Sequence, residues 1–344
     1  MVLLCRYGKT TGSPGTRILP YFVFVTTQKS LFSGIMMTAP LKIKTIRSIV
    51  FITLLVCSVL PGRAIAISPA DSARRSTADQ ALQYLNSIKD LQQSKWWPNV
   101  PPAQLLTNLK TFTTRPLAFY EGKTTNFCSY SALTYIPLTY DPLGFARFMI
   151  DLYRNGQANF GKNQLKPSKP VRMEAGLLRY KGSLDINPAG QMWFLTLADH
   201  YKGYLNIFNR RFQKGDENTF WASTNFAKFN RMLRRLFNGT VKARGADLFR
   251  PRIKNLPAYL EAQMQKGLVY LYLNNKKLYR KSHTQPLIST PTHYVLLTNI
   301  RQLPDGNIEF EYWDYGARAV QQLSPEFLKN IIYGVSVWTP RISK

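Results

Sequence analysis

The periodicity of the sequence changes near residue 268, and this change limits the possible folds more than any other feature. Upstream of it, apolar residues recur at the spacing of a helix face, as in Ala81, Leu85 and Ile88. Downstream, short apolar or alternating runs typical of strands occupy 268–273, 292–300, 307–314 and 333–339. Helices that come first and antiparallel strands that come last predict an α+β fold.

Capping and stop signals bound the expected helices. Asp141-Pro142 and Asn187-Pro188 each combine an N-cap residue with a first-turn proline. Pro137 is expected to stop the helix that begins near Phe127. We expect 161–181 to be a basic loop with a short strand. The expected helices are 76–93, a short one through 105–109, 127–136, 141–155, 187–208, 223–237, a short one from 255 to 267, and a short one after Ser324-Pro325.

The N-terminal 66 residues have the pattern of a leader and secretory signal peptide. Lys42, Lys44 and Arg47 precede an apolar stretch at 49–60, and Ala64-Ile65-Ala66 is a small-residue cleavage site. The signal is expected to start at Met36 or Met37. An N-terminal membrane anchor is the alternative, although the apolar stretch is short for a bilayer span.

Cleavage after Ala66 would leave 278 residues, enough for one large domain or two small lobes. We expect an N-terminal helical segment at 67–115, either a pro-region or part of a helical lobe, followed by a catalytic domain at 116–344. The protein would then be exported, either periplasmic or secreted, with no stable transmembrane segment after processing.

The chain is strongly basic. Removing the eight Lys and Arg residues of the first 66 leaves 38 basic against 18 acidic side chains, a net charge of about +20. A field of this sign favours an anionic polymer or surface as a partner. Specific nucleic-acid binding is a weaker interpretation, because export separates the protein from nucleic acid. It would rest on basic clusters with interleaved aromatics at 208–212, 231–235, 249–254 and 272–281.

Processing would also leave one cysteine, Cys128, which excludes an intramolecular disulfide. A single thiol in an exported protein is either reactive or a buried residue that behaves as a small hydrophobe. Cys128 stands where polar residues give way to an apolar helical pattern, and a helix N-terminus favours a thiolate.

Two downstream residues could complete a catalytic site with Cys128. His293 begins an expected strand and could move the thiol proton, and Asp314 ends the next strand and could orient the imidazole. Each also has a structural interpretation, since His293 could be a half-buried strand residue and Asp314 a turn former. The catalytic interpretation requires their side chains to meet. We therefore expect His293 directly opposite Asp314. A four-residue loop at 302–305 would give this pairing, and so would a β-bulge that shifts the register to the same result.

The order of Cys128, the strand residues His293-Tyr294-Val295, and Trp313-Asp314-Tyr315-Gly316 resembles that of papain-like cysteine peptidases. The resemblance covers roughly 120–340 and rests on short motifs. It implies a helical lobe that carries the nucleophile helix, followed by an antiparallel β-sheet or barrel lobe that carries the base. It also implies amide hydrolysis through a thioester.

The sequence departs from that family in one respect. Papain-type enzymes place an oxyanion-stabilising glutamine a few residues before the cysteine, whereas Gly122 stands six residues before Cys128 and no glutamine is near. Asn126 could donate to the oxyanion instead, or could serve as an N-cap. The missing glutamine favours the alternative of a catalytically silent papain-like module that binds an anionic polymer.

Other chemistries lack their motifs. The scattered histidines do not form a zinc motif, and the sequence holds no phosphate-binding glycine loop or serine-hydrolase elbow. We therefore expect no cofactor and no metal. The sequence predicts an exported papain-like cysteine hydrolase that acts on a peptide or cell-wall peptide substrate, with Cys128, His293, Asp314 and Asn126 at its site.

Overall fold

We describe the fold from a computed structural model, in which residues 74–202, 211–279 and 291–341 are described. The chain divides into two units, Met1–Ile65 and Ala66–Lys344, and all described residues belong to the second. The expected signal peptide, its start and its cleavage site lie outside the described residues. Within the described residues, no helix is both long and apolar enough to cross a membrane.

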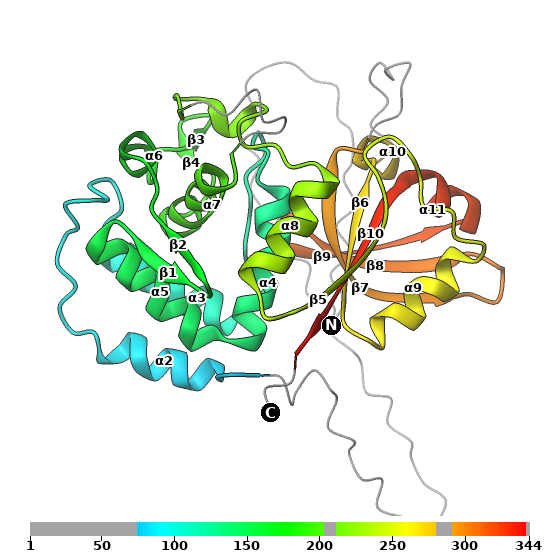
Figure 1. Ribbon diagram of the computed structural model, residues 1–344, viewed down its shortest axis with the longest axis horizontal. Coiled ribbons are helices and arrows are strands. Elements are labelled where there is room, and N and C mark those ends of the chain that lie inside the picture. Colours follow the sequence, from blue (N-terminus) through cyan, green and yellow to red (C-terminus); the bar gives the residue numbers. More distant parts are fainter. Residues whose placement is uncertain (1–73, 203–210, 280–290, 342–344) are drawn as a thin grey trace, which may run out of the picture. The chain divides into compact units, whose positions relative to one another are not determined.

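The first half of the second unit is mainly helical (Figure 1). Its helices are α2 (Ala78–Ser87), α3 (Pro102–Thr114), α4 (Cys128–Tyr140), α5 (Pro142–Asn155), α6 (Lys169–Glu174), α7 (Pro188–His200) and α8 (Phe226–Leu236). Two small hairpins interrupt them, formed by β1 (Ala158–Phe160) with β2 (Asn163–Leu165) and β3 (Arg179–Tyr180) with β4 (Ser183–Leu184). A 3-10 turn, η2 (Asp216–Asn218), precedes α8.

Side-chain caps start most of the longer helices. Asp141, Asn187 and Asn225 each accept a hydrogen bond from a first-turn N–H group of α5, α7 and α8. Gly156 ends α5 in the left-handed conformation that glycine adopts without strain. Asp141 and Asn187, each followed by a proline, are the caps that predicted the starts of α5 and α7 from the sequence.

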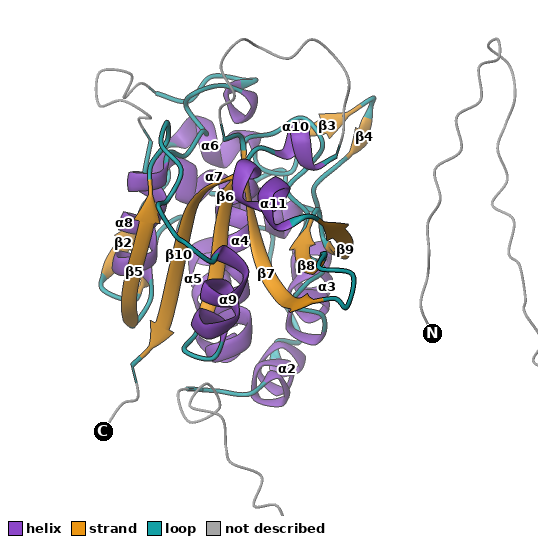
Figure 2. Ribbon diagram, turned by 90° about the vertical axis from the view of Figure 1, so that its right-hand side faces the viewer, coloured by secondary structure: helices purple, strands orange, loops and turns teal. Residues whose placement is uncertain are grey.

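The second half forms a six-stranded antiparallel sheet in the order β5-β10-β6-β7-β8-β9 (Figure 2). The strands are β5 (Gly239–Gly245), β6 (Leu268–Leu273), β7 (His293–Gln302), β8 (Ile308–Asp314), β9 (Ala317–Leu323) and β10 (Ile332–Pro340). Three helices lie among them in the sequence: α9 (Leu256–Met264), α10 (Asn275–Leu278) and α11 (Pro325–Ile331). The predicted α+β class is confirmed.

Alternation along the central strands builds a separate core on each face of the sheet. In β6, Tyr270 and Tyr272 pack with the helical half, whereas Val269 and Leu271 pack with α9 and its neighbours. The face toward the helices is aromatic: the ring of Tyr294 stacks on Tyr272 and on Phe229 of α8, with centroids 4.3 and 4.2 Å apart. Buried residues of α2 and α3 belong to the same core as those of α4.

The structure corrects several predicted boundaries. Pro137 lies inside α4 and does not end it, because most side chains of this helix are buried and packing outweighs one lost backbone bond. The helix expected over 76–93 ends at Ser87, and α7 ends at His200, with 203–208 outside the described residues. Residues 161–181 contain β2, α6 and β3 where one short strand was expected.

Two strands of the sheet were not predicted. Both β5 and β9 are outer strands whose residues are mostly exposed or half-buried, so neither shows the apolar alternation that marks a strand in sequence. Each of them pairs with a strand that is mostly buried: β5 pairs with β10, and β9 pairs with β8.

Candidate active site

Cys128 is the first residue of α4, and its side chain is half-buried. Phe127 occupies the N-cap position, and no side chain among the described residues caps this helix end. The first-turn N–H groups of α4 therefore face the region of the thiol without a capping side chain. A helix N-terminus in this state favours an anionic sulfur beside it.

Asn126 fixes the start of α4 to the turn before α8. Its backbone N–H donates to Glu217 O at 2.8 Å, and its Nδ2 donates to Thr219 O at 3.0 Å. Asn126 is thus not the N-cap of α4. One Nδ2 hydrogen is used by Thr219, which leaves the other for a further acceptor.

His293 is the first residue of β7 and lies between Cys128 and Asp314. Only 3% of its surface is exposed, and its imidazole interacts electrostatically with the Cys128 side chain. Its Nε2 is hydrogen-bonded to Asp314 Oδ1, which leaves Nδ1 for the thiol. The structure therefore brings together the three residues singled out in the sequence, one from α4 and two from the sheet.

The hairpin that joins β7 to β8 reaches this contact by a different register from the one predicted. Near the turn, Gln302 is opposite Ile308, and Leu303 N–H donates to Asn307 O at 2.8 Å. The loop is thus three residues long, 304–306, and the expected four-residue loop at 302–305 is wrong.

An irregularity at Thr298 shifts the register by one residue, so that Leu296 is opposite Trp313. Continuing that register would place Asp314 opposite Val295, with His293 as its diagonal neighbour on the same face. Diagonal neighbours are within reach of long side chains. The hydrogen bond between His293 and Asp314 therefore forms across a diagonal and not between directly opposite residues.

A chain of hydroxyl donors fixes the Asp314 carboxylate. Tyr279, which follows α10, donates its hydroxyl to Asp314 Oδ2. Tyr312 Oη lies 3.4 Å from Tyr279 Oη and accepts from Gln321 Nε2 at 3.0 Å. Both carboxylate oxygens of Asp314 are thus acceptors, and this network assigns the proton to His293 Nε2 and an acceptor role to Nδ1 in the neutral ring.

The surroundings of His293 favour its protonated form. Burial by itself lowers the pKa of His293. The charges of Asp314 and Cys128, together with the hydrogen bond to Asp314, outweigh burial and raise this pKa well above its ordinary value. A protonated His293 places a positive charge beside Cys128.

Tyr315 covers one face of the His293 ring. The two rings stack at 20° with centroids 5.1 Å apart. Tyr315 adopts a left-handed backbone conformation with φ 47°, which is strained for a residue with a Cβ. Gly316 follows with φ 73°, and a Cβ at this position would meet Phe119 O at 3.1 Å. The tight turn at 315–316 thus seats the histidine ring against the 119–121 segment.

Glu121 is a fourth ionisable residue at the site. Only 1% of its surface is exposed, and neither carboxylate oxygen has a hydrogen-bond partner among the described residues. The pKa of Glu121 is raised to about 8, chiefly by burial; the charge of His293 lowers it and that of Asp314 raises it. At neutral pH this carboxyl group is therefore largely protonated.

Glu121, His293 and Asp314 also satisfy the distance requirement for a metal site, since one ligand atom from each lies within 4.8 Å of the others. His293 and Asp314 are, however, hydrogen-bonded to each other, and Tyr279 occupies the second oxygen of Asp314. A metal ion would have to replace these bonds, so the arrangement fits a proton-transfer network better than a metal centre.

Sequence reasoning did not find Tyr279, Tyr315 or Glu121. Tyr279 lies 35 positions before Asp314. Glu121 stands seven positions before Cys128, and no local pattern distinguishes it from other acidic residues. His200, which the sequence suggested to be a helix-face residue, is exposed at the end of α7. His283 lies outside the described residues.

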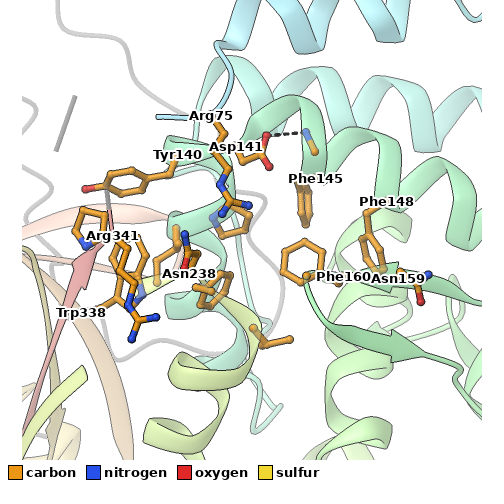
Figure 3. A pocket seen from close by; sticks show the side chains of 17 residues that line it. Arg75, Tyr140, Asp141, Phe145, Phe148, Asn159, Phe160, Asn238, Trp338 and Arg341 are labelled. Atoms are coloured by element: carbon orange, nitrogen blue, oxygen red, sulfur yellow. Dashed lines mark hydrogen bonds between the residues drawn. The ribbon is translucent and has the colours of Figure 1, made fainter. Parts of the chain in front are cut away.

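A cavity of about 260 Å³ lies at the opposite end of α4 (Figure 3). Its wall includes Ile136, Pro137 and Tyr140, together with aromatic residues of α5 and Trp338 of β10. The 13 residues of α4 span roughly 20 Å, so this cavity is separate from the thiol.

Comparison with known proteins adds no relative: no family model, no curated protein and no solved structure matches this chain. The functional interpretation therefore rests on the residues and their geometry.

Proposed function

We propose that this protein is a papain-like cysteine hydrolase that cleaves an amide bond through a thioester. One observation carries the proposal: the buried His293 imidazole lies between a helix N-terminal thiol, Cys128, with which it interacts, and a carboxylate, Asp314, to which it is hydrogen-bonded. The order of a nucleophile helix and then an antiparallel sheet with the other two residues supports a papain-like fold.

Each residue has a defined part in the proposed reaction. The Cys128 thiolate attacks the amide carbonyl carbon to form a tetrahedral oxyanion. The His293 imidazolium gives its proton to the leaving nitrogen as the C–N bond breaks and a thioester forms. Neutral His293 then takes a proton from water, whose oxygen attacks the thioester and releases the acid and the thiol. Asp314 holds the imidazole in position throughout.

The proposed oxyanion donors are two N–H groups at the start of α4. The backbone N–H of Cys128, at the uncapped start of α4, is one donor. We propose the free Nδ2 hydrogen of Asn126 as a second, since its other hydrogen is bonded to Thr219 O. This arrangement would replace the upstream glutamine that papain-type enzymes use.

The proposed substrate is a polypeptide or the peptide part of a cell wall. The net positive charge of about +20 favours an anionic polymer or surface near the target. We also propose that residues 67–115 are a structural part of the helical lobe and not a removable pro-region, because α2 and α3 share the core of α4.

Thiol alkylation tests the catalytic pair without a known substrate. A free cysteine has little thiolate at pH 6. If His293 stabilises the thiolate of Cys128, iodoacetamide should label the wild-type chain almost as fast at pH 6 as at pH 8. His293→Ala should label at pH 6 on the order of 10- to 100-fold more slowly, as followed by mass spectrometry.

The control is His200→Ala, which removes an exposed histidine from the end of α7 and should leave the labelling rate unchanged. Equal labelling of wild type and His293→Ala at pH 6 would exclude the catalytic pair. The silent-module alternative predicts that Cys128 reacts no faster than free cysteine.

We propose further that the protein is exported after cleavage behind Ala66, on the pattern of charges, apolar residues and Ala64-Ile65-Ala66. Mass spectrometry of the protein from its native host should find Ile67 as the N-terminal residue. A retained 49–60 segment would instead indicate a membrane-anchored protein.

A further inference from the structure

The turn between β5 and α9 exposes two large apolar side chains. Leu248 and Phe249 are adjacent in sequence and are 66% and 74% exposed. Scattered single apolar residues on a surface are ordinary, but an adjacent pair at this level of exposure removes little of its apolar area from water in the isolated protein. Such a pair is typical of a surface that is covered by a partner.

The backbone of this turn is held in place. Ala246 N–H donates to Phe249 O and to Tyr333 O, each at 3.1 Å. The Asp247 carboxylate accepts from the N–H of Phe226 at 2.9 Å, which ties the turn to the start of α8. The turn therefore holds the backbone of Leu248 and Phe249 in place, shortly after the end of the outer strand β5.

Positive charges flank the turn on both sides. Lys242 and Arg244 are exposed on β5, and Arg244 lies over the ring of Tyr259 in α9 at 5.2 Å. Arg252 and Lys254 are exposed and alternate with the buried Pro251 and Ile253.

Arg250 joins the turn itself to the sheet. It donates to Asn330 O at 3.0 Å and to Tyr333 Oη at 3.1 Å. The stretch 239–254 holds five basic residues and one acid, Asp247, which is already bonded to the start of α8.

We propose that Leu248, Phe249 and their flanking cations form a docking surface for an anionic phospholipid membrane. The two apolar side chains would enter the boundary between head groups and acyl chains, and the cations would contact lipid phosphates. Leucine offers no ring on which a nucleotide base could stack, so the pair suits lipid better than a polynucleotide. The proposal is independent of the chemistry at Cys128.

Vesicle co-sedimentation tests the proposal, using the chain from Ile67 onward because this part forms a compact unit with both cores. The wild-type chain should bind vesicles that contain phosphatidylglycerol and not vesicles of phosphatidylcholine alone, and 0.5 M salt should weaken the binding. Each cation near an anionic surface strengthens binding about fivefold. Arg252→Glu with Lys254→Glu should therefore weaken it by at least about 25-fold.

The apolar pair gives the decisive variant. Leu248→Ser with Phe249→Ser keeps every charge and should weaken vesicle binding by at least about tenfold. Phe220→Ser, which changes a residue that is 68% exposed outside this turn, is the matched control and should bind as wild type does. Wild-type binding by the Leu248→Ser, Phe249→Ser variant would overturn the proposal, as would failure of the wild-type chain to bind anionic vesicles while it binds oligonucleotides.

Discussion

Cys128→Ser is expected to lose at least about 1,000-fold of any amide hydrolysis while it keeps the wild-type fold. A hydroxyl in place of the thiol is a much weaker nucleophile, because His293 would have to remove its proton at the moment of attack. The side chain is half-buried and nearly the same size as cysteine, so the free energy of unfolding should change by less than about 1 kcal/mol. Amine release from casein and from purified cell-wall peptides measures activity, and urea unfolding measures stability.

The neighbouring residue provides the control for this substitution. Ser129 is fully buried in the next position of α4, where its hydroxyl bonds Thr224 Oγ1 at 2.8 Å, away from the histidine network. Ser129→Ala should lose stability, on the order of 1 kcal/mol, and retain hydrolysis. Full activity of Cys128→Ser would show that the thiol is not the nucleophile, whatever the alkylation experiment gives.

The sequence singled out three residues of the candidate site because each carries a local signal. Cys128 is the single thiol that remains after the proposed processing, and it stands where a helix begins. His293 begins one strand and Asp314 ends the next. Chain order and secondary structure were therefore enough to suggest that these side chains meet, and His293 and Asp314 do so.

The details of that meeting depend on interactions that no local pattern encodes. The register of the hairpin is set by a three-residue loop and an irregularity at Thr298, whose hydroxyl bonds Glu311. Tyr279 reaches Asp314 from the C-terminal end of α10. Asn126 turns toward Thr219 because α8 and its preceding turn pack beside α4. These partners come from distant segments, so their contacts are a product of the tertiary structure.

Glu121→Gln is expected to make the protein more stable at alkaline pH and not at acid pH. Burial raises the pKa of Glu121 from 4.5 to about 8, so the folded protein holds a proton that the unfolded chain releases. A raised carboxyl pKa gives stability that is complete below about pH 4.5 and is lost as the pH rises toward 8. Glutamine has nearly the same shape and cannot ionise, so it removes this loss.

One pKa unit corresponds to about 1.4 kcal/mol. Because Glu121 shares its surroundings with His293 and Asp314, we expect a total difference on the order of 3 kcal/mol between pH 5 and pH 8. Urea unfolding of wild type and Glu121→Gln across this range measures it. The two proteins should have equal stability near pH 4.5, and the curves should separate steadily above it.

Glu309→Gln provides a control with the opposite sign. Glu309 is half-buried, and its hydrogen bond with Arg301 lowers its pKa, so any stability that it provides is present at neutral pH and lost on acidification. Glu309→Gln should therefore be slightly less stable than wild type at pH 8, where Glu121→Gln is more stable. Parallel curves for wild type and Glu121→Gln would mean that Glu121 is already ionised when the protein is folded. The cluster beside His293 would then carry two buried negative charges, and the protonated-carboxyl description of the site would fail.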